Sequence, residues 1–266
     1  MAFRLPDIDE TQAPLLDHLV ELRARLLRAI AAVVLAFAVC LYFASDIFGF
    51  LIRPLTKAFP PGQGKLVYTK LYEAFFVEVK VALFAAFFIS FPVIANQLWA
   101  FVAPGLYAKE KKAFLPFLFF TPVLFFIGAA TAYYLVMPKA FEYLLSFQGQ
   151  KGGLDIEALP AAGDYLGLVM QFILAFGISF LLPVLLLLLN RAGIVSRKQL
   201  IGLRRYVIVI LTGFAAVITP PDLMSQILLL IPLLLLFEGS LLIMWLGERK
   251  EAKAAAVPAE VPEVLP

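Results

Sequence analysis

The chain has 266 residues, of which 62% are hydrophobic and only 15% are charged. Because a soluble domain carries about 45–50% apolar and about 25% charged residues, this composition excludes an ordinary soluble protein and indicates a membrane protein. The net charge of +3 gives no reason to expect a nucleic-acid partner, and the single Cys40 and single His18 exclude a disulfide framework and a metal site of His and Cys ligands.

The first predicted element is an amphipathic helix at about residues 13–25, in which apolar residues recur at intervals of three and four. It leads into the first of six segments that we expect to span the membrane as helices, since hydrocarbon about 30 Å thick needs about 20 helical residues. The six segments cover residues 26–44, 75–98, 113–136, 166–189, 206–218 and 223–246.

The fifth segment is short, and only Thr219-Pro220-Pro221-Asp222 separates it from the sixth. Because a double proline cannot continue the incoming helix, the two segments are predicted to form a helical hairpin with a tight turn. Four further prolines lie in or near the predicted spans and should kink them: Pro92, Pro122, Pro183 and Pro232. We therefore expect an all-α polytopic fold with six kinked helices in a cup-like arrangement.

The distribution of positive charge predicts the orientation in the membrane. Fifteen of the 22 Lys and Arg residues lie before or just within the start of the first span, in the loops at about 99–112 and 190–205, or after the last span. The positive-inside rule places these regions in the cytoplasm, so both termini are expected there and the number of spans must be even, which agrees with six. Residues 1–248 should then form a single transmembrane domain, followed by a disordered cytoplasmic tail at 249–266.

Glu21 is the first candidate for a ligand-binding residue. Arg25 follows it by four residues, in the order that favours an ion pair on a helix surface. One interpretation is a solvated pair of little energetic consequence; the other is that Glu21 receives a cationic ligand.

Glu110 is the second candidate, the only acidic residue in a basic loop that we place on the same side of the membrane. A carboxylate can accept a forked, two-bond contact from a guanidinium group. Two carboxylates from separate segments would therefore match a ligand with adjacent arginines, provided that the fold brings them together.

Several motifs occur in a fixed order along the chain. They are His18-Leu19-Val20-Glu21-Leu22-Arg23-Ala24-Arg25, the stretch from Pro92-Val93 to Pro104-Gly105-Leu106-Tyr107 followed by Glu110, Ala175-Phe176-Gly177-Ile178-Ser179-Phe180, Arg205-Tyr206, and Thr219-Pro220-Pro221-Asp222. In sequence, spacing and number of spans, this pattern resembles the TatC family over about residues 12–248.

The resemblance implies a receptor in the bacterial cytoplasmic membrane that binds the twin-arginine signal peptides of folded precursor proteins. It implies partnership with single-span TatA- and TatB-type subunits and with further copies of the chain, in transport driven by the proton motive force. It also implies that Glu21 and Glu110 bind the arginine pair, and that Arg23 and Phe101 line or support that site. A last set of positions has structural or partner-binding roles in the family: Pro54, Phe75, Phe76, Thr219, Asp222 and Gln226.

The chain departs from the family at Leu181, where a polar or acidic residue often precedes the next proline, so a role for a buried acid at this position is in doubt. The main alternative function is a secondary solute transporter or channel, which would need several polar groups at mid-membrane and usually paired repeats. An intramembrane enzyme is disfavoured because Ser90, Ser179 and Ser225 have no histidine partner within the spans. We therefore expect no enzymatic activity and no cofactor.

Overall fold

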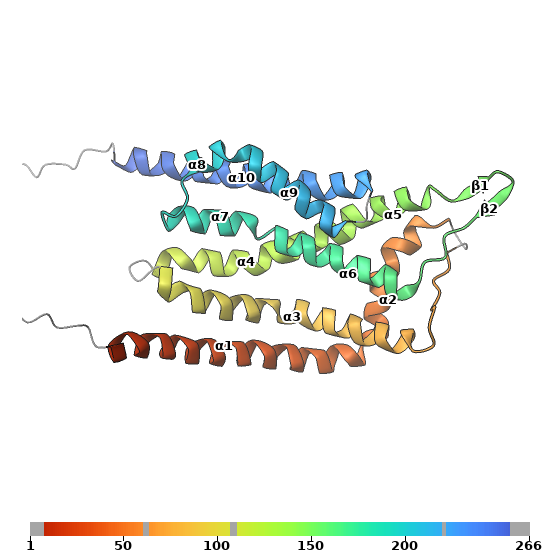
Figure 1. Ribbon diagram of the computed structural model, residues 1–266, viewed down its shortest axis with the longest axis horizontal. Helices are drawn as coiled ribbons and strands as arrows, with labels where there is room; N and C mark the ends of the chain where they lie inside the picture. Colours follow the sequence, from red (N-terminus) through yellow and green to blue (C-terminus); the bar gives the residue numbers. More distant parts are fainter. Residues whose placement is uncertain (1–7, 61–63, 107–110, 220–221, 256–266) are drawn as a thin grey trace, which may run out of the picture. The chain divides into compact units, whose positions relative to one another are not determined.

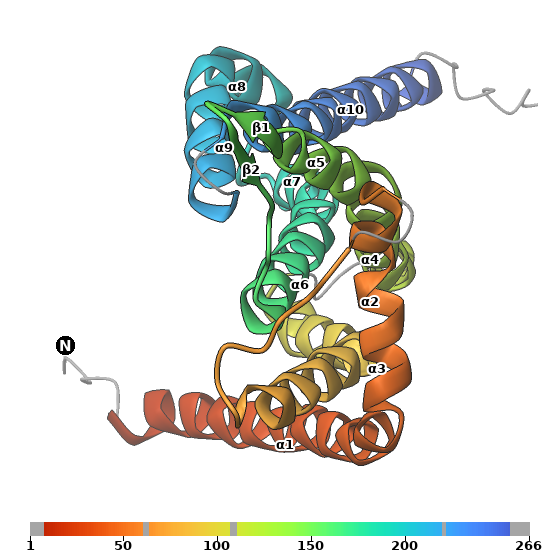
Figure 2. The same ribbon diagram turned by 90° about the vertical axis from the view of Figure 1, so that its right-hand side faces the viewer.

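The computed structural model describes residues 8–60, 64–106, 111–219 and 222–255. They group into two compact units, Met1–Gly177 and Ile178–Pro266 (Figure 1, Figure 2). The described residues are mostly helical, as the sequence predicts. Five stretches within them are long and apolar enough to cross a membrane: His18–Tyr42, Glu73–Phe101, Phe117–Leu145, Ala162–Arg191 and Leu223–Arg249. The predicted fifth span falls in a helix of 15 residues, which is shorter than these.

In the first unit, α1 (Ile8–Tyr42) packs along α3 (Glu73–Leu106), as Figure 1 shows. The expected amphipathic helix and the first span are therefore one continuous helix. Small buried side chains, Cys40, Ala82 and Ala86, lie where the two helices meet, and Val33 and Phe37 pack against them. Small residues at such a contact let two membrane helices approach closely, because association in lipid depends on packing.

The helix that begins as α4 (Lys111–Thr131) widens into a π-helical turn, η1 (Ala132–Val136), and then continues as α5 (Met137–Leu145). Pro138 follows this turn and lacks the N–H that would bond to the carbonyl of Tyr134, which gives a local reason for the widened turn. By contrast, Pro92 and Pro122 lie within α3 and α4 without interrupting them.

Two long connections in the first unit contain secondary structure of their own. The first holds α2 (Ala44–Ala58), and the second, which follows α5, holds a hairpin of β1 (Gly149–Lys151) and β2 (Leu154–Ile156). The hairpin turns at Gly152 and Gly153, whose φ angles of 62° and 85° suit glycine. Backbone hydrogen bonds join the two connections, because Val67 N donates to Pro160 O at 3.1 Å and Ala162 N donates to Val67 O at 2.9 Å.

Pro54 lies buried within α2, and its missing N–H leaves the carbonyl of Phe50 without its helical donor. The hydroxyl of Tyr133 donates to that carbonyl at 2.6 Å, and the Tyr133 and Phe50 rings stack with centroids 4.4 Å apart. Tyr165, which is buried, donates in the same way to Leu51 O at 2.9 Å. Two tyrosines from distant parts of the chain therefore satisfy the backbone around Pro54 and hold α2 in place.

We expect Tyr133→Phe to lower the free energy of unfolding in detergent by about 1–3 kcal/mol, because it leaves the Phe50 carbonyl unsatisfied. In a Pro54→Ala background the same change should have a smaller effect, since residue 54 then supplies an N–H. Tyr134→Phe, at an exposed neighbouring ring, is the matched control and should be neutral. Equal losses from Tyr133→Phe in both backgrounds would contradict this account of Pro54.

Glu73, the first residue of α3, joins α3 to the start of α6 (Ala162–Ser179). One carboxylate oxygen accepts from Gly163 N at 2.8 Å. The other accepts from Thr69 N at 2.6 Å, from Thr69 Oγ1 at 2.8 Å and from Lys70 N at 3.2 Å. A single carboxylate therefore satisfies backbone donors in two segments that lie 90 residues apart.

We expect Glu73→Gln to speed hydrogen exchange at the amides of Thr69, Lys70 and Gly163 by about tenfold, because an amide side chain loses the charge and turns an NH2 group toward backbone donors. Exchange mass spectrometry of the protein in detergent measures this. Glu78→Gln, at an exposed acid on the same helix, is the control and should leave these amides unchanged. If the exchange rates of these amides are unchanged in Glu73→Gln, the Glu73 carboxylate does not hold the two segments together.

The second unit contains α7 (Leu182–Arg191), α8 (Arg197–Gly202), α9 (Arg204–Ile218) and α10 (Leu223–Ala255). The helical chain breaks between Ser179 and Leu182, just before Pro183, while Pro232 lies inside an unbroken α10. Gln226 Nε2 lies 3.4 Å from Thr212 O, and Arg204 pairs with Glu238 at 2.8 Å, so α9 and α10 lie antiparallel to each other.

The predicted tail begins within α10, which continues to Ala255 before the described residues end. The single-domain boundary, the cup-like arrangement and a disordered tail remain predictions.

Candidate functional site

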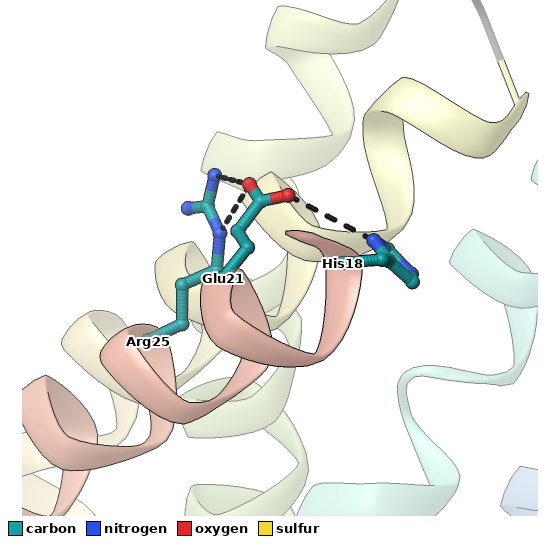
Figure 3. A network of polar contacts seen from close by, with 3 residues as sticks. All are labelled: His18, Glu21 and Arg25. Atoms are coloured by element: carbon teal, nitrogen blue, oxygen red, sulfur yellow. Dashed lines mark hydrogen bonds and ion pairs between the residues drawn. The ribbon is translucent and has the colours of Figure 1, made fainter. Parts of the chain in front are cut away.

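Glu21 lies on α1, and Figure 3 shows its carboxylate between Arg25 and His18 of the same helix. Arg25 donates to Glu21 Oε1 twice, from Nε at 2.9 Å and from a terminal nitrogen at 2.5 Å. The ion pair expected from the four-residue spacing is therefore present. The other oxygen, Oε2, faces His18 Nδ1 at 3.8 Å, which is beyond hydrogen-bonding distance. One carboxylate oxygen is thus engaged by a guanidinium, and the other has no close hydrogen bond from either of these two residues.

His18 links the site to α3. Its ring stacks on Phe101 with centroids 4.2 Å apart and an interplanar angle of 14°. Glu21 and Phe101, which the family resemblance places in one predicted site, therefore both lie beside His18. No feature of the sequence indicated this stack, because a contact between helices some 80 residues apart leaves no periodic signal.

An apolar cavity of about 130 Å³ lies beside this group, between α1 and α3. Leu22, Leu26, Ile94 and Leu98 contribute to its lining, together with Phe101. A ligand group that reaches Glu21 would therefore have apolar surface next to it.

Two further predicted residues of this site have different outcomes. Arg23 is exposed on α1, and residues two positions apart on a helix do not share a face, so Arg25 rather than Arg23 contacts Glu21. Glu110 lies outside the described residues. The convergence of Glu21 and Glu110 is therefore still a prediction, as is the supporting role of Arg23.

The other predicted positions form two separate groups. Pro54 is buried in α2 as described above, whereas Phe75 and Phe76 are exposed near the start of α3, with side chains 66% and 51% accessible. Exposed aromatic rings at the start of a membrane helix suit contact with lipid or with another protein.

In the second unit, Thr219 is buried at the end of α9 and its hydroxyl donates to Ala215 O at 3.0 Å. Asp222 precedes α10 and accepts from Ser225 N at 2.7 Å, which is the arrangement of a helix N-cap. Gln226 donates across to α9. Three predicted residues thus stabilise the ends of two packed helices, and their partner-binding role stays a prediction.

Comparison with known proteins identifies the family. The model of the family "Sec-independent protein translocase protein (TatC)" matches residues 17–232. The chain belongs to the TatC family. The TatC protein of Magnetococcus marinus is 48% identical over 247 residues, which are 93% of this chain and 89% of that protein. The TatC protein of Escherichia coli is 40% identical over 233 residues, 87% of each chain.

Solved TatC structures have the same fold. A crystal structure of a twin-arginine translocase receptor, TatC, in the detergent DDM matches with a TM-score of 0.76 and 38% identity. The match covers 85% of this chain and 99% of that one. A second crystal structure of the TatC receptor matches with a TM-score of 0.74 and 37% identity.

Membership of the TatC family makes the chain a membrane-embedded component of the Sec-independent protein translocase, as its motifs had indicated. The family is one of translocase components rather than enzymes, and it works with other Tat subunits and signal peptides in general. The alternative of a solute transporter or channel is not favoured.

Proposed function

We propose that this chain is the receptor that binds twin-arginine signal peptides of folded precursor proteins, with Glu21 as a primary ligand for an arginine side chain. The observation that carries the proposal is the Glu21 carboxylate itself. It already accepts two hydrogen bonds from a guanidinium on one oxygen, and its other oxygen lies 3.8 Å from the nearest His18 nitrogen. Arginine of an incoming peptide offers the same donor geometry for that second oxygen.

Glu110 is proposed to bind the second arginine. The stack of His18 on Phe101 supports this, because it brings the part of α3 that leads toward residue 110 next to Glu21. The apolar cavity beside Phe101 would hold an apolar side chain that neighbours the arginines.

The remaining parts of the proposal concern assembly. We propose six spans, with α9 and α10 as the last hairpin, in the bacterial inner membrane, and both termini in the cytoplasm. Thr219 and Gln226 would take part in docking the single helix of a TatA- or TatB-type subunit, and transport would use the proton motive force. The packing of α9 against α10 supports the hairpin, and the bias of Lys and Arg supports the orientation.

The first test is the binding of a synthetic twin-arginine peptide to the purified full chain in detergent, compared with a twin-lysine peptide of otherwise identical sequence. We expect the lysine peptide to bind about tenfold more weakly, because an ammonium group lacks the planar fork that contacts a carboxylate through two bonds. Equal affinity for both peptides would mean that recognition does not depend on guanidinium contacts.

A further inference from the structure

A second cavity, of about 320 Å³, lies far along α3 from Phe101, between the segment 64–72 and the starts of α3 and α6. Its lining includes Thr69, Lys70, Tyr72, Phe76, Lys80 and Asp164. Two of the candidate membrane spans begin beside it, at Glu73 and at Ala162. With these helices placed across the membrane as we propose, the cavity lies near the level of the lipid head groups.

The cavity is lined by two lysines and two acidic residues, all within the described chain, which form no ion pairs with one another. The carboxylate of Glu73 is occupied by the donors of Thr69, Lys70 and Gly163. Within the described parts of the chain, the ion pairs include neither Lys80 nor Asp164, nor the ammonium of Lys70. The ammonium of Lys70 lies 5.9 Å from the centre of the Tyr72 ring. The cavity therefore offers two ammonium groups and the Asp164 carboxylate to a ligand.

Lys80 is unusual because it lies inside a candidate span. It follows Glu73 by seven residues, which is about 10 Å along the helix, and its side chain is exposed. A charged group at this depth is costly unless its long side chain reaches the interface and meets an anion there. Phe76 and Glu73 precede Lys80 by four and seven residues, so the three residues lie on the same face of α3. The Lys80 side chain, extended along this face, lines the cavity together with them.

We propose that this cavity binds the head group of a zwitterionic phospholipid that carries a primary amine, such as phosphatidylethanolamine. The phosphate lies between Lys70 and Lys80, and the lipid ammonium donates to Asp164. The acyl chains follow the exposed apolar surface of α3 at Phe76. A purely anionic head group fits less well, because Asp164 would repel it. The proposal depends on the membrane location of the chain and not on its binding of signal peptides.

The test uses the full chain in nanodiscs that contain equal amounts of phosphatidylethanolamine, phosphatidylcholine and phosphatidylglycerol. After transfer to a mild detergent, native mass spectrometry measures which lipids remain bound. We expect phosphatidylethanolamine to be retained about tenfold more than phosphatidylcholine, whose quaternary ammonium cannot donate a hydrogen bond to Asp164. Asp164→Asn should remove that preference.

Lys80→Gln should lower retention of phosphatidylethanolamine about tenfold, and Lys70→Gln provides a second variant of the same site. Lys57→Gln, at an exposed lysine on α2 away from the cavity, is the matched control and should have no effect. A far-UV circular dichroism spectrum and thermal transition equal to those of the parent chain verify that each variant is folded. An excess of inorganic phosphate should not displace the lipid.

Three results would overturn the proposal. The first is equal retention of all three lipids, or retention that neither Lys80→Gln nor Asp164→Asn changes. The second is preferential retention of phosphatidylglycerol, which would indicate an anionic ligand. The third is displacement by inorganic phosphate, which would indicate a site for free phosphate rather than for lipid.

Discussion

Glu21→Gln is expected to weaken the binding of a twin-arginine signal peptide about a hundredfold, because glutamine keeps the shape of the side chain but loses the charge that strengthens both hydrogen bonds of a guanidinium. The fold should survive the change. Glu21 is 37% exposed, and its contacts to Arg25 and His18 lie within one helix, so the packing of α1 on α3 does not depend on them. Fluorescence anisotropy with a labelled peptide and the purified chain measures the affinity.

Glu78→Gln is the control for this prediction, since Glu78 is an exposed acid near the other end of α3. It should leave the affinity unchanged and so exclude a general effect of net charge. A peptide affinity that is the same for Glu21→Gln and the unmodified chain would remove Glu21 from the binding site.

Phe125→Ala is expected to lower the free energy of unfolding by about 3 kcal/mol. Phe125 is fully buried and stacks on Phe91 with centroids 3.6 Å apart, while Phe88 lies 4.9 Å from it. Removal of a buried Phe from a water-soluble core costs about 3–5 kcal/mol. We expect the lower end of this range for Phe125. In a membrane protein the unfolded side chain lies in apolar lipid rather than in water, so the loss of stability comes mainly from the lost packing contacts.

Gly177 on α6 provides a second, more specific test of this packing. A Cβ atom at residue 177 would lie only 2.7 Å from Cε2 of Phe125. Gly177→Ala should therefore cost about 1–3 kcal/mol by overpacking. In the Phe125→Ala background, the added methyl group occupies space that the ring has left, so the double variant should lose less stability than the sum of the single variants.

The matched control is Gly167→Ala on the same helix, where no atom lies within 4 Å of the added Cβ. It should be neutral or slightly stabilising, since alanine favours the helix. Unfolding in mixed micelles compares the four variants and the parent chain. Strict additivity of Gly177→Ala and Phe125→Ala would show that the two residues are not in contact.

Features that depend on neighbours within one helix are visible as a pattern in the sequence. Long apolar runs predicted the helices that form the candidate spans, and the spacing of Glu21 and Arg25 predicted their ion pair, because both depend on neighbours within one element. The family resemblance predicted that Phe101 belongs to the same site as Glu21, and the structure places the Phe101 ring on His18, beside Glu21; the shared site itself stays a prediction.

Other features were not predictable from the sequence in this way. The hydroxyl of Tyr133 reaches the backbone at Phe50, 83 residues away, and Glu73 reaches Gly163, 90 residues away. Such contacts depend on how separate helices pack, and neither partner carries a local signal. The helix α2 was not among the predicted elements, since its 15 residues are too few and too polar for a span.

The central claim is that Glu21 binds an arginine of the signal peptide, and a double-mutant cycle tests it most directly. The affinities of the parent chain and of Glu21→Gln are measured for peptides in which each arginine in turn is replaced by glutamine. If Glu21 contacts one arginine, replacing that arginine should weaken binding to the parent chain strongly but have little further effect on Glu21→Gln. If both arginine replacements weaken binding to Glu21→Gln as much as to the parent chain, Glu21 contacts neither arginine and the account is wrong.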